Sequence, residues 1–498
     1  MDYLKLQNGS DVRGVALEGI PGEAVTLTPD IAREISQAFA LWLADKKGKE
    51  ASSLKVGVGR DSRLSGPMLQ QAVLEGLKAQ GVEGVDCDMA STPAMFMSTV
   101  LKGFEFDGAI MITASHLPFN RNGLKFFTHD GGLESRDIKD ILSRCGNIDV
   151  AAQPGPDTRC AALIDAYAAH LCQVISQGIN MGEKPLAGFK IAVDAGNGAG
   201  GFFASKVLAP LGADVSASRY LDPDGSFPNH IPNPENKEAM ESIRQAVLEG
   251  KCDLGVIFDT DVDRAGAVLD DGEELSRNRL IGLMAAIVAQ EAPHSVVVTD
   301  SVTSAELKDF IEGSLGCVHH RFKRGYKNVI NEAIRLNEEG KECLLAMETS
   351  GHGALKENYF LDDGAYLSAK IIIQMARLRK EGKSLGQMLS ALREPLEAKE
   401  YRPRLTTQDF KTTGLAVLSA LEKYAKGQQG WIAATDNHEG LRFTIPAQQG
   451  WFLLRLSLHD PLMPLNIESN KAGGADAIRL EVLEFLNTCE GLDLTPVK

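Results

Sequence analysis

No segment of this sequence is apolar for long enough to cross a bilayer, and its first residues, Met1-Asp2-Tyr3-Leu4-Lys5, lack the apolar core of a signal peptide. We therefore expect a protein that is neither exported nor inserted in a membrane. The eight cysteines are scattered and include no Cys-x-x-Cys pair. This pattern argues against a zinc site and against a disulfide framework. The sequence predicts a protein of the reducing cytoplasm.

Positive charge is also scarce. The chain has 52 lysines and arginines against 67 aspartates and glutamates, and the resulting formal net charge of −15 disfavours binding to nucleic acid. If the substrate is an anion, a few locally placed arginines must overcome this overall field.

Short apolar segments alternate with amphipathic ones along most of the chain, which predicts an α/β fold. Predicted strands cover residues 54–59, 190–193, 254–258, 295–299 and 343–347. Predicted helices cover residues 67–80, 202–211, 328–336 and 365–379, the last capped by Asp362 and Asp363. Towards the C-terminus, residues 431–435, 441–445 and 451–456 are typical of antiparallel strands and residues 475–486 of a helix.

A chain of 498 residues is too long for a single hydrophobic core. Turn-forming residues predict joints near Gln153-Pro154-Gly155-Pro156, near Asp270-Asp271-Gly272 and near Arg393-Glu394-Pro395. We therefore expect three α/β domains, residues 1–153, 154–270 and 271–394, followed by a smaller α+β domain, residues 395–498.

Three of the apolar strands run directly into polar loops, where α/β proteins place their ligands. The first loop, Thr113-Ala114-Ser115-His116-Leu117-Pro118, brings a hydroxyl and an imidazole to the end of a buried strand. The third loop, Glu348-Thr349-Ser350-Gly351-His352, follows the strand at 343–347. Taken alone, a Ser-His pair is weak evidence of catalysis, because Ser, His and Pro are common in ordinary loops.

The second loop contains Asp259-x-Asp261-x-Asp263. Three carboxylates at alternate positions can converge on a hard divalent cation, and an all-oxygen site with open positions suits Mg²⁺. A calcium-binding EF-hand does not fit, because Arg264 stands where that loop needs glycine and an apolar strand precedes the motif. A solvated acidic turn is the alternative.

The spacing Gly196-x-Gly198-x-x-Gly201 satisfies the fingerprint of a dinucleotide-binding loop. Asp222, near the position of a ribose-binding acid, belongs to a turn-forming segment, Asp222-Pro223-Asp224-Gly225. We interpret the glycines as a tight strand-to-helix turn and expect no NAD.

Together the three loops identify a family resemblance. Thr113-Ala114-Ser115-His116-x-Pro118 with Asn122-Gly123-x-Lys125, Asp259-x-Asp261-x-Asp263-Arg264 and Glu348-x-Ser350-Gly351-His352, in this order, resemble the motifs of the α-D-phosphohexomutases, the phosphoglucomutase/phosphomannomutase superfamily. Further matches are Asp11-Val12-Arg13-Gly14, Gly59-Arg60-Asp61-Ser62-Arg63, Asp194-Ala195-Gly196-Asn197-Gly198, Asp224-Gly225-Ser226-Phe227-Pro228-Asn229, Gly325-Tyr326-Lys327 and Arg455-x-Ser457. The resemblance covers essentially the whole chain.

The resemblance implies four domains, three with mixed α/β cores and a mobile C-terminal α+β domain, around a central cleft. It implies a cytoplasmic isomerase of carbohydrate metabolism that interconverts hexose 1-phosphate and hexose 6-phosphate. Ser115 would carry a phosphoryl group, a hexose 1,6-bisphosphate would be the intermediate and activator, and the enzyme would be a monomer or homodimer.

The resemblance also implies roles for individual residues. Mg²⁺ would be held by Asp259, Asp261 and Asp263 together with Ser115. Lys125 and Arg13 would help proton transfer and charge stabilisation, with His116 and Arg264 as further catalytic residues. The sugar phosphate would be bound by Glu348, Ser350, His352, Lys327, Arg455, Ser457 and His459.

Some positions depart from the family pattern. Leu117 stands where Asn is frequent, Thr260 and Val262 replace glycines of the metal loop, and Met347 replaces a glycine before the sugar loop. The segment Ser457-Leu458-His459-Asp460-Pro461 stands where relatives have Ser-Asn-Thr, and its aspartate would repel a phosphate. Lys471 and Arg442 are therefore alternative phosphate anchors.

Three functions remain beside a mutase acting on glucose or mannose phosphates. Thr349 does not match the Gln that is usual in phosphoglucosamine mutases, but that substrate stays open. The others are a metal-dependent sugar phosphatase and a catalytically silent sugar-phosphate-binding protein.

Overall fold

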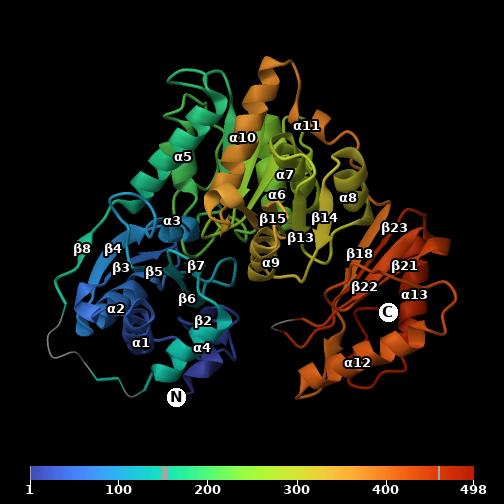
Figure 1. The fold of residues 1–498 in the computed structure, drawn as a ribbon, viewed down its shortest axis with the longest axis horizontal. Helices are drawn as coiled ribbons and strands as arrows, with labels where there is room; N and C mark the ends of the chain where they lie inside the picture. The colour runs from blue at the N-terminus through green and yellow to red at the C-terminus, as the bar shows by residue number, and fades with distance from the viewer. Residues whose placement is uncertain (1, 147, 150–154, 458–459) are drawn as a thin grey trace. The chain divides into compact units, whose positions relative to one another are not determined.

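The computed structural model describes residues 2–146, 148–149, 155–457 and 460–498 (Figure 1). The chain divides into two compact units, the first formed by Met1–Ser276 and Ser350–Gly386, the second by Arg277–Thr349 and Gln387–Lys498. Of the joint expected near Gln153-Pro154-Gly155-Pro156, the first two residues lie outside the described ranges, and the four domain limits stay predictions. Within the described ranges no helix is both long and apolar enough to span a membrane.

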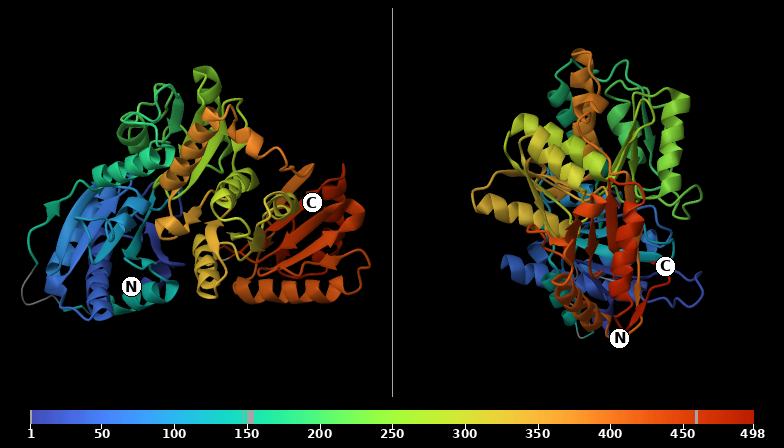
Figure 2. Two further views of the ribbon diagram at one scale, coloured as in Figure 1. Left: turned by 45° about the horizontal axis from the view of Figure 1, so that its top comes forward. Right: turned by 90° about the vertical axis from the view of Figure 1, so that its right-hand side faces the viewer.

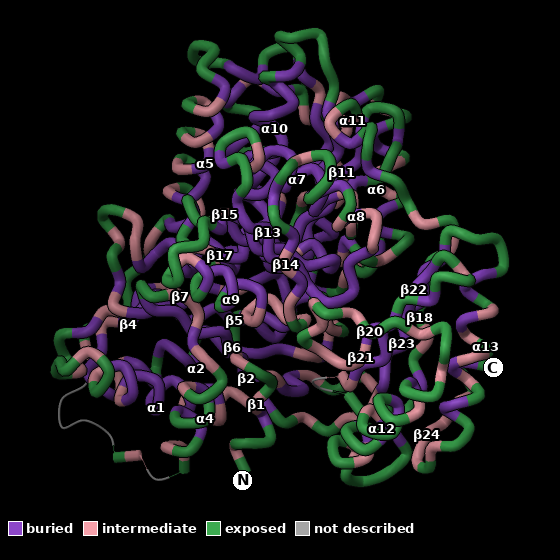
Figure 3. Tube along the Cα trace, turned by 45° about the vertical axis from the view of Figure 1, so that its right-hand side comes forward, coloured by how far each residue is buried: buried purple, intermediate pink, exposed green. Residues whose placement is uncertain are grey.

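The first unit contains a large mixed sheet. Its strand order is β1-β2-β6-β5-β3-β4-β8, and β7 pairs with β6. The central strands β3, β4 and β5 are parallel and β6 runs antiparallel to β5, so β5 is buried along its whole length (Figure 3). Bounds are β1 Gln7–Asn8, β2 Asp11–Val15, β3 Lys55–Arg60, β4 Glu83–Met89, β5 Gly108–Ile112, β6 Arg121–Thr128, β7 Gly131–Gly132, β8 Arg159–Cys160, α1 Pro29–Lys47, α2 Gly66–Ala79, α3 Thr92–Met97 and α4 Ser135–Arg144.

A second sheet of the first unit has the order β12-β11-β10-β9, with β9 and β10 parallel. Strand β10, which precedes the aspartate loop, is fully buried. Bounds are β9 Ile191–Asp194, β10 Leu254–Phe258, β11 Ala265–Leu269, β12 Glu274–Leu275, α5 Leu163–Ile179, α6 Lys237–Gly250 and α10 Gly364–Lys380. Strands β16 Gly353–Leu355 and β17 Leu361–Asp362 are not part of this sheet and pair with each other in antiparallel fashion.

The second unit begins with three parallel strands in the order β14-β13-β15. A five-stranded antiparallel sheet, β18-β23-β22-β21-β20, follows near the C-terminus, and helices α12 and α13 contact it (Figure 2). Bounds are β13 Val296–Thr299, β14 Val318–Arg321, β15 Cys343–Met347, β18 Glu397–Tyr401, β19 Arg404–Leu405, β20 Ile432–Ala433, β21 Leu441–Ile445, β22 Gly450–Leu454, β23 Leu465–Ser469, β24 Leu492–Asp493, α7 Arg277–Glu291, α8 Ala305–Asp309, α9 Tyr326–Glu338, α12 Phe410–Ala425 and α13 Gly474–Leu486.

Mixed α/β sheets followed by an antiparallel C-terminal sheet confirm the predicted fold class. Two local predictions need correction. The helix expected at 202–211 is wound mainly as a π-helix, Phe203–Leu208. Asp363 caps α10 by accepting a hydrogen bond from the Tyr366 amide at 2.9 Å, but Asp362 does not, because it accepts instead from the Gly353 amide at 2.9 Å.

The antiparallel sheet has two different faces. Phe443, Ile445 and Phe452 belong to the apolar core with α12 and α13. The opposite face carries charge. The Arg442 guanidinium lies 3.5 Å above the Trp451 ring, and the Trp451 indole donates to Glu468 at 3.0 Å.

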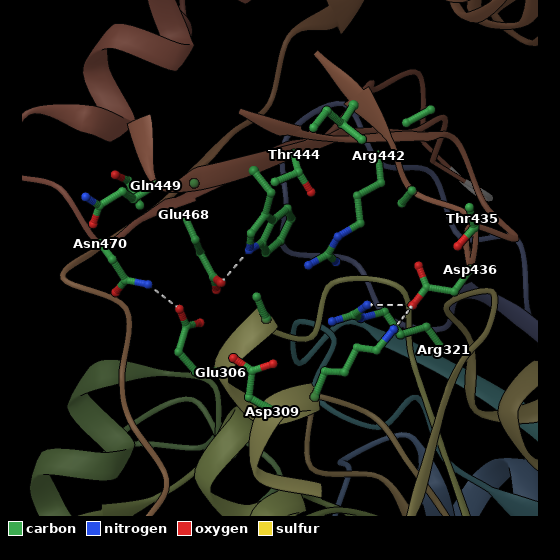
Figure 4. Close-up of a pocket in the computed structure, with 18 residues that line it drawn as sticks. Glu306, Asp309, Arg321, Thr435, Asp436, Arg442, Thr444, Gln449, Glu468 and Asn470 are labelled. Atoms are coloured by element: carbon green, nitrogen blue, oxygen red, sulfur yellow. Dashed lines mark hydrogen bonds and ion pairs between the residues drawn. The ribbon is translucent and has the colours of Figure 1, made fainter. Parts of the chain in front are cut away.

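A cavity of about 500 Å³ lies against this charged face (Figure 4). Its wall includes Arg442, Trp451 and Glu468 from the sheet, Glu306 and Asp309 from α8, and Arg321 from β14. Burial raises the pKa of Glu468 to about 7, with Arg442 opposing the shift and Glu306 adding to it. The ionised carboxylate is therefore less stable in the fold than in the unfolded chain.

We predict that Glu468→Gln flattens the pH dependence of stability. Between about pH 4.5 and pH 7 the unfolded chain releases the Glu468 proton while the fold retains it, so this group lowers the unfolding free energy as pH rises through that window. Removing it should make the variant more stable than wild type at pH 8 by on the order of 1–3 kcal/mol, with little difference at pH 4.5. Urea unfolding across this range measures the effect.

Glu484→Gln, on the exposed side of α13, is the matched control and should follow wild type at every pH. A Glu468→Gln variant with the wild-type pH profile would contradict the prediction.

Candidate active site

The Ser115 loop is held in an unusual backbone conformation. Ser115 has φ 49°, in the left-handed region, and its amide donates to the Thr113 hydroxyl at 2.9 Å. Thr113 in turn donates to Asp61 at 2.7 Å. Such a conformation persists in a non-glycine residue only where its surroundings fix it. The loop after β5 is therefore constrained rather than a free surface turn.

Arg63 supplies much of that constraint. Its side chain is 1% exposed and donates to the carbonyls of Leu117 at 2.6 Å and Pro118 at 2.8 Å, as well as to the Ser115 carbonyl. The Phe227 ring lies 5.3 Å from the Arg63 guanidinium carbon. Sequence reasoning noted the Gly59–Arg63 motif but gave Arg63 no role.

The Ser115 hydroxyl lies between a carboxylate and a guanidinium. It donates to Asp259 Oδ2 at 2.8 Å and accepts from Arg264 Nη2 at 2.9 Å. Arg264 also contacts His116 Nδ1. The loops after β5 and β10, far apart in sequence, thus bring Ser115, His116, Asp259 and Arg264 together as the motifs had suggested.

The three predicted metal ligands converge. Asp259, Asp261 and Asp263 are buried, and one carboxylate oxygen of each lies within 4.8 Å of the others. Lys125 on β6 contacts Asp263 and lies 3.3 Å from Asp261 Oδ2. Thr92 at the start of α3 donates to that same oxygen at 2.5 Å.

This crowding leaves negative charge to be neutralised. Burial and the neighbouring Asp263 and Asp261 raise the pKa of Asp259 well above its usual range. Asp263 behaves differently: burial opposes ionisation, but Lys125, His352 and Arg264 together lower its pKa. Asp261 Oδ1 and Asp263 Oδ1 are buried without a hydrogen-bond partner among the described residues. Converging carboxylate oxygens that lack a hydrogen-bond donor fit a hard divalent cation.

Arg13 lies on β2 and stabilises the Ser115 loop by a hydrogen bond to its backbone. Its guanidinium donates to the Thr113 carbonyl at 3.1 Å and to Asp11 at 2.8 Å. Although burial opposes it, Asp11 and then Asp261 raise the pKa of Arg13. Arg13 is thus a fixed positive charge beside the aspartate loop.

Close packing explains two glycines of the Gly196-x-Gly198-x-x-Gly201 spacing. A Cβ on Gly198 would lie 2.6 Å from the Thr260 carbonyl oxygen, and one on Gly201 would lie 2.1 Å from the Leu221 carbonyl oxygen. Glycine at 198 therefore lets the turn after β9 approach the aspartate loop.

Part of the predicted sugar loop also joins this group in the first unit. His352 forms an isolated β-bridge with Arg264 and its Nδ1 lies 2.9 Å from the Ser350 hydroxyl. His352 Nε2 lies 3.4 Å from Asp362 and 3.7 Å from Asp263.

The other predicted sugar-binding residues belong to the second unit. Glu348 is 3% exposed and accepts from the Gly325 amide at 2.6 Å, just before α9, whose first turn carries Lys327. Thr349 donates to Asp300 at 2.8 Å. Burial raises the pKa of Asp300 to about 6, against the opposing charge of Arg324.

Arg455 follows β22 and is 8% exposed. Its Nε atom has no hydrogen-bond partner among the described residues, and its Nη1 faces Glu439 Oε1 at 3.7 Å. Ser457 accepts from the Asp460 amide at 3.3 Å, while His459 lies outside the described residues. Sequence reasoning missed Glu439.

The two alternative anchors are otherwise engaged. Arg442 donates to the carbonyls of Ser301 and Thr303, each at 3.0 Å, besides stacking on Trp451. Lys471 donates to the Ala447 carbonyl at 3.1 Å.

Known proteins are similar to this chain over most of its length. Residues 5–149, 165–272 and 276–396 match the family models of phosphoglucomutase/phosphomannomutase α/β/α domains I, II and III. A phosphomannomutase/phosphoglucomutase of Pseudomonas syringae pv. tomato is 30% identical over 445 residues, 88% of this chain and 89% of that protein. A phosphoglucomutase of Neisseria gonorrhoeae is 28% identical over 473 residues, 93% and 94% of the two chains.

A crystal structure gives the same result. The phosphoglucomutase/phosphomannomutase family protein of Burkholderia thailandensis superposes with a TM-score of 0.79 at 27% identity, covering 98% of each chain. With three domain models matched in order and a relative aligned over most of its length, this chain belongs to the phosphoglucomutase/phosphomannomutase family, within the α-D-phosphohexomutase superfamily.

Proposed function

We propose that this mutase interconverts hexose 1-phosphate and hexose 6-phosphate with Ser115 as the phosphoryl carrier. Family membership gives the class, an isomerase acting on hexose phosphates; the carrier and the intermediate are our proposal. One observation supports it above the others: the Ser115 hydroxyl lies between Asp259 and Arg264, beside three converging buried carboxylates.

Phosphoryl transfer depends mostly on positioning and charge stabilisation. In the first half-reaction the bond from phosphorus to Ser115 Oγ breaks, a sugar hydroxyl oxygen takes the phosphoryl group, and the hydroxyl proton replaces it on Ser115. The product is hexose 1,6-bisphosphate. The second half-reaction returns the other phosphoryl group to Ser115 by the same steps in reverse.

The neighbouring cations have separate tasks in this scheme. Arg264, which donates to the Ser115 hydroxyl, orients the oxygen and stabilises its charge when the phosphoryl group leaves. His116 lies against Arg264 and limits its movement. Lys125 and Arg13 are the proposed helpers of proton transfer and charge stabilisation, because both are fixed beside the aspartate loop.

Mg²⁺ held by Asp259, Asp261, Asp263 and the phosphorylated Ser115 would supply positive charge to the phosphoryl oxygens. The site fits such an ion because its carboxylates converge and two of their oxygens accept no hydrogen bond from the described residues.

The substrate is held, in this proposal, by two groups of residues. Glu348, Ser350 and His352 bind sugar hydroxyls, with Lys327 as a nearby cation. Arg455 and Ser457, with His459, bind the phosphate that is not reacting. The Nε atom of buried Arg455 supports this role, since it has no hydrogen-bond partner among the described residues and could donate to a phosphate oxygen.

We propose glucose or mannose phosphates as substrates. Thr349 is buried and bonded to Asp300, so its side chain is a structural part of the sugar loop. Glucosamine phosphates and a phosphatase reaction remain the alternatives. A coupled assay on glucose, mannose and glucosamine 1-phosphates, primed with the bisphosphate, ranks the sugars, and release of inorganic phosphate would reveal a phosphatase. The cytoplasmic location and the monomer or homodimer state stay predictions.

Ser115→Ala should abolish turnover, because no other hydroxyl occupies the position between Asp259 and Arg264. Intact-mass spectrometry of wild type incubated with hexose 1,6-bisphosphate should show one phosphoryl group, located on Ser115 by peptide mapping. Ser143→Ala, on the exposed side of α4, should keep full activity. Persistent absence of a Ser115 adduct in active wild type would disprove the carrier role.

Asp261→Asn should lower kcat by several orders of magnitude, because it weakens a hard-cation site and leaves phosphoryl charge uncompensated. KM should change much less, and the Mg²⁺ concentration for half-maximal activity should rise. Asp270→Asn, in an exposed turn after β11, is the control. Full activity of wild type in excess EDTA would contradict the metal assignment.

Arg455→Ala should raise the KM for hexose 1-phosphate at least tenfold, about 1.4 kcal/mol, because a bidentate phosphate contact is lost. Lys411→Ala, an exposed cation on α12, should leave KM unchanged. If Arg455→Ala has wild-type kinetics, the anchor is another cation, and Lys471 and Arg442 are the next to test.

A further inference from the structure

The carboxylate of Glu439 is surrounded by three groups of the kind that bind anions. Glu439 lies between β20 and β21, and its Oε2 accepts from the Ser301 hydroxyl at 2.5 Å and from the Arg324 amide at 3.2 Å. Its Oε1 faces Arg455 Nη1 at 3.7 Å. A hydroxyl, a backbone amide and a guanidinium are the donors that commonly bind phosphate oxygens.

The negative charge of Glu439 offsets the positive charge of Arg455, but the two side chains are too far apart to form a hydrogen bond. The separation of 3.7 Å is longer than a hydrogen bond, and Arg455 Nε has no partner among the described residues. Burial lowers the pKa of Arg455, and the charge of Glu439 opposes that shift. The Arg455 guanidinium thus faces the Glu439 carboxylate at ion-pair distance and still has an N–H group that can bind a second anion.

We propose that Glu439 is a positioning residue that competes with the distal phosphate of the substrate for Arg455. The inference rests on the proposed function, in which Arg455 binds that phosphate. Because the Ser301 and Arg324 contacts fix the Glu439 carboxylate, an arriving phosphate meets its negative charge at close range. Glu439 therefore limits the affinity of Arg455 for phosphate.

Limited affinity suits the reaction. A hexose 1,6-bisphosphate must release its distal phosphate, reverse its orientation and bind again through the other phosphate before the second transfer. A guanidinium with no opposing carboxylate would bind each phosphate more tightly and release it more slowly. Glu439 thus favours release over tight retention.

The test compares binding of inorganic phosphate, by isothermal titration calorimetry, with steady-state kinetics. Glu439→Gln keeps the shape of the side chain and removes its charge, so it should bind phosphate at least fivefold more tightly than wild type. KM for hexose 1-phosphate should fall, and kcat should fall with it as release slows. Glu439→Ala provides a second variant and should also bind phosphate more tightly.

Two further variants complete the design. Glu422→Gln, an exposed carboxylate of α12 in the same unit, should match wild type in both measurements. In the Arg455→Ala background, Glu439→Gln should no longer strengthen phosphate binding, because the competition requires the guanidinium.

The outcomes separate this inference from the proposed function. If Arg455→Ala loses phosphate binding but both Glu439 variants bind phosphate as wild type does, the competition is wrong and the phosphate site stands. If the Glu439 variants bind phosphate more weakly, Glu439 merely supports Arg455 and the inference is overturned. If Arg455→Ala binds phosphate normally, the site assignment fails and the inference fails with it.

Discussion

The first unit depends on one electrostatic constraint, which is that three carboxylates are buried close together. Asp259, Asp261 and Asp263 cannot all remain ionised in contact unless positive charge surrounds them. Lys125 comes from β6, Arg264 from the aspartate loop itself, and Thr92 from α3. Because these partners belong to different elements, the two sheets of the first unit are linked to each other through the groups of the candidate active site.

Buried charge in the second unit is arranged on the same principle but balanced less completely. Arg442 stacks on Trp451, whose indole donates to Glu468, so one aromatic side chain contacts both a buried guanidinium and a buried carboxyl group. Arg455 and Glu439 face each other at 3.7 Å without a hydrogen bond. In the first unit charges are paired closely around Ser115, whereas in the second unit the Arg455 guanidinium is buried with its Nε lacking a hydrogen-bond partner among the described residues.

The loops of the candidate active site could be predicted from the sequence where their polar side chains directly follow an apolar strand. The apolar runs before Ser115, Asp259 and Glu348 are the strands β5, β10 and β15, so the loops could be located from pattern alone. Arg63 could not be assigned a role, because its partners are backbone carbonyls more than fifty residues away, and carbonyls leave no mark in a sequence. Glu439 could not be identified from the sequence for a similar reason, because its position depends on the Ser301 hydroxyl and the Arg324 amide, which are distant in the chain. The π-helix at Phe203–Leu208 has the composition of an ordinary helix.

The sugar loop contains a division that no motif shows. Within the segment proposed to bind the sugar, Thr349 is the last residue of one part of the second unit and Ser350 is the first residue of the next part of the first unit. Thr349 is fixed by Asp300 on one side of this division, and His352 is fixed by its bridge to Arg264 on the other. Gly351, with φ 96°, supplies a backbone conformation that other residues rarely adopt. Glu348 and His352 are therefore held by contacts within different units although they are only four positions apart in the sequence.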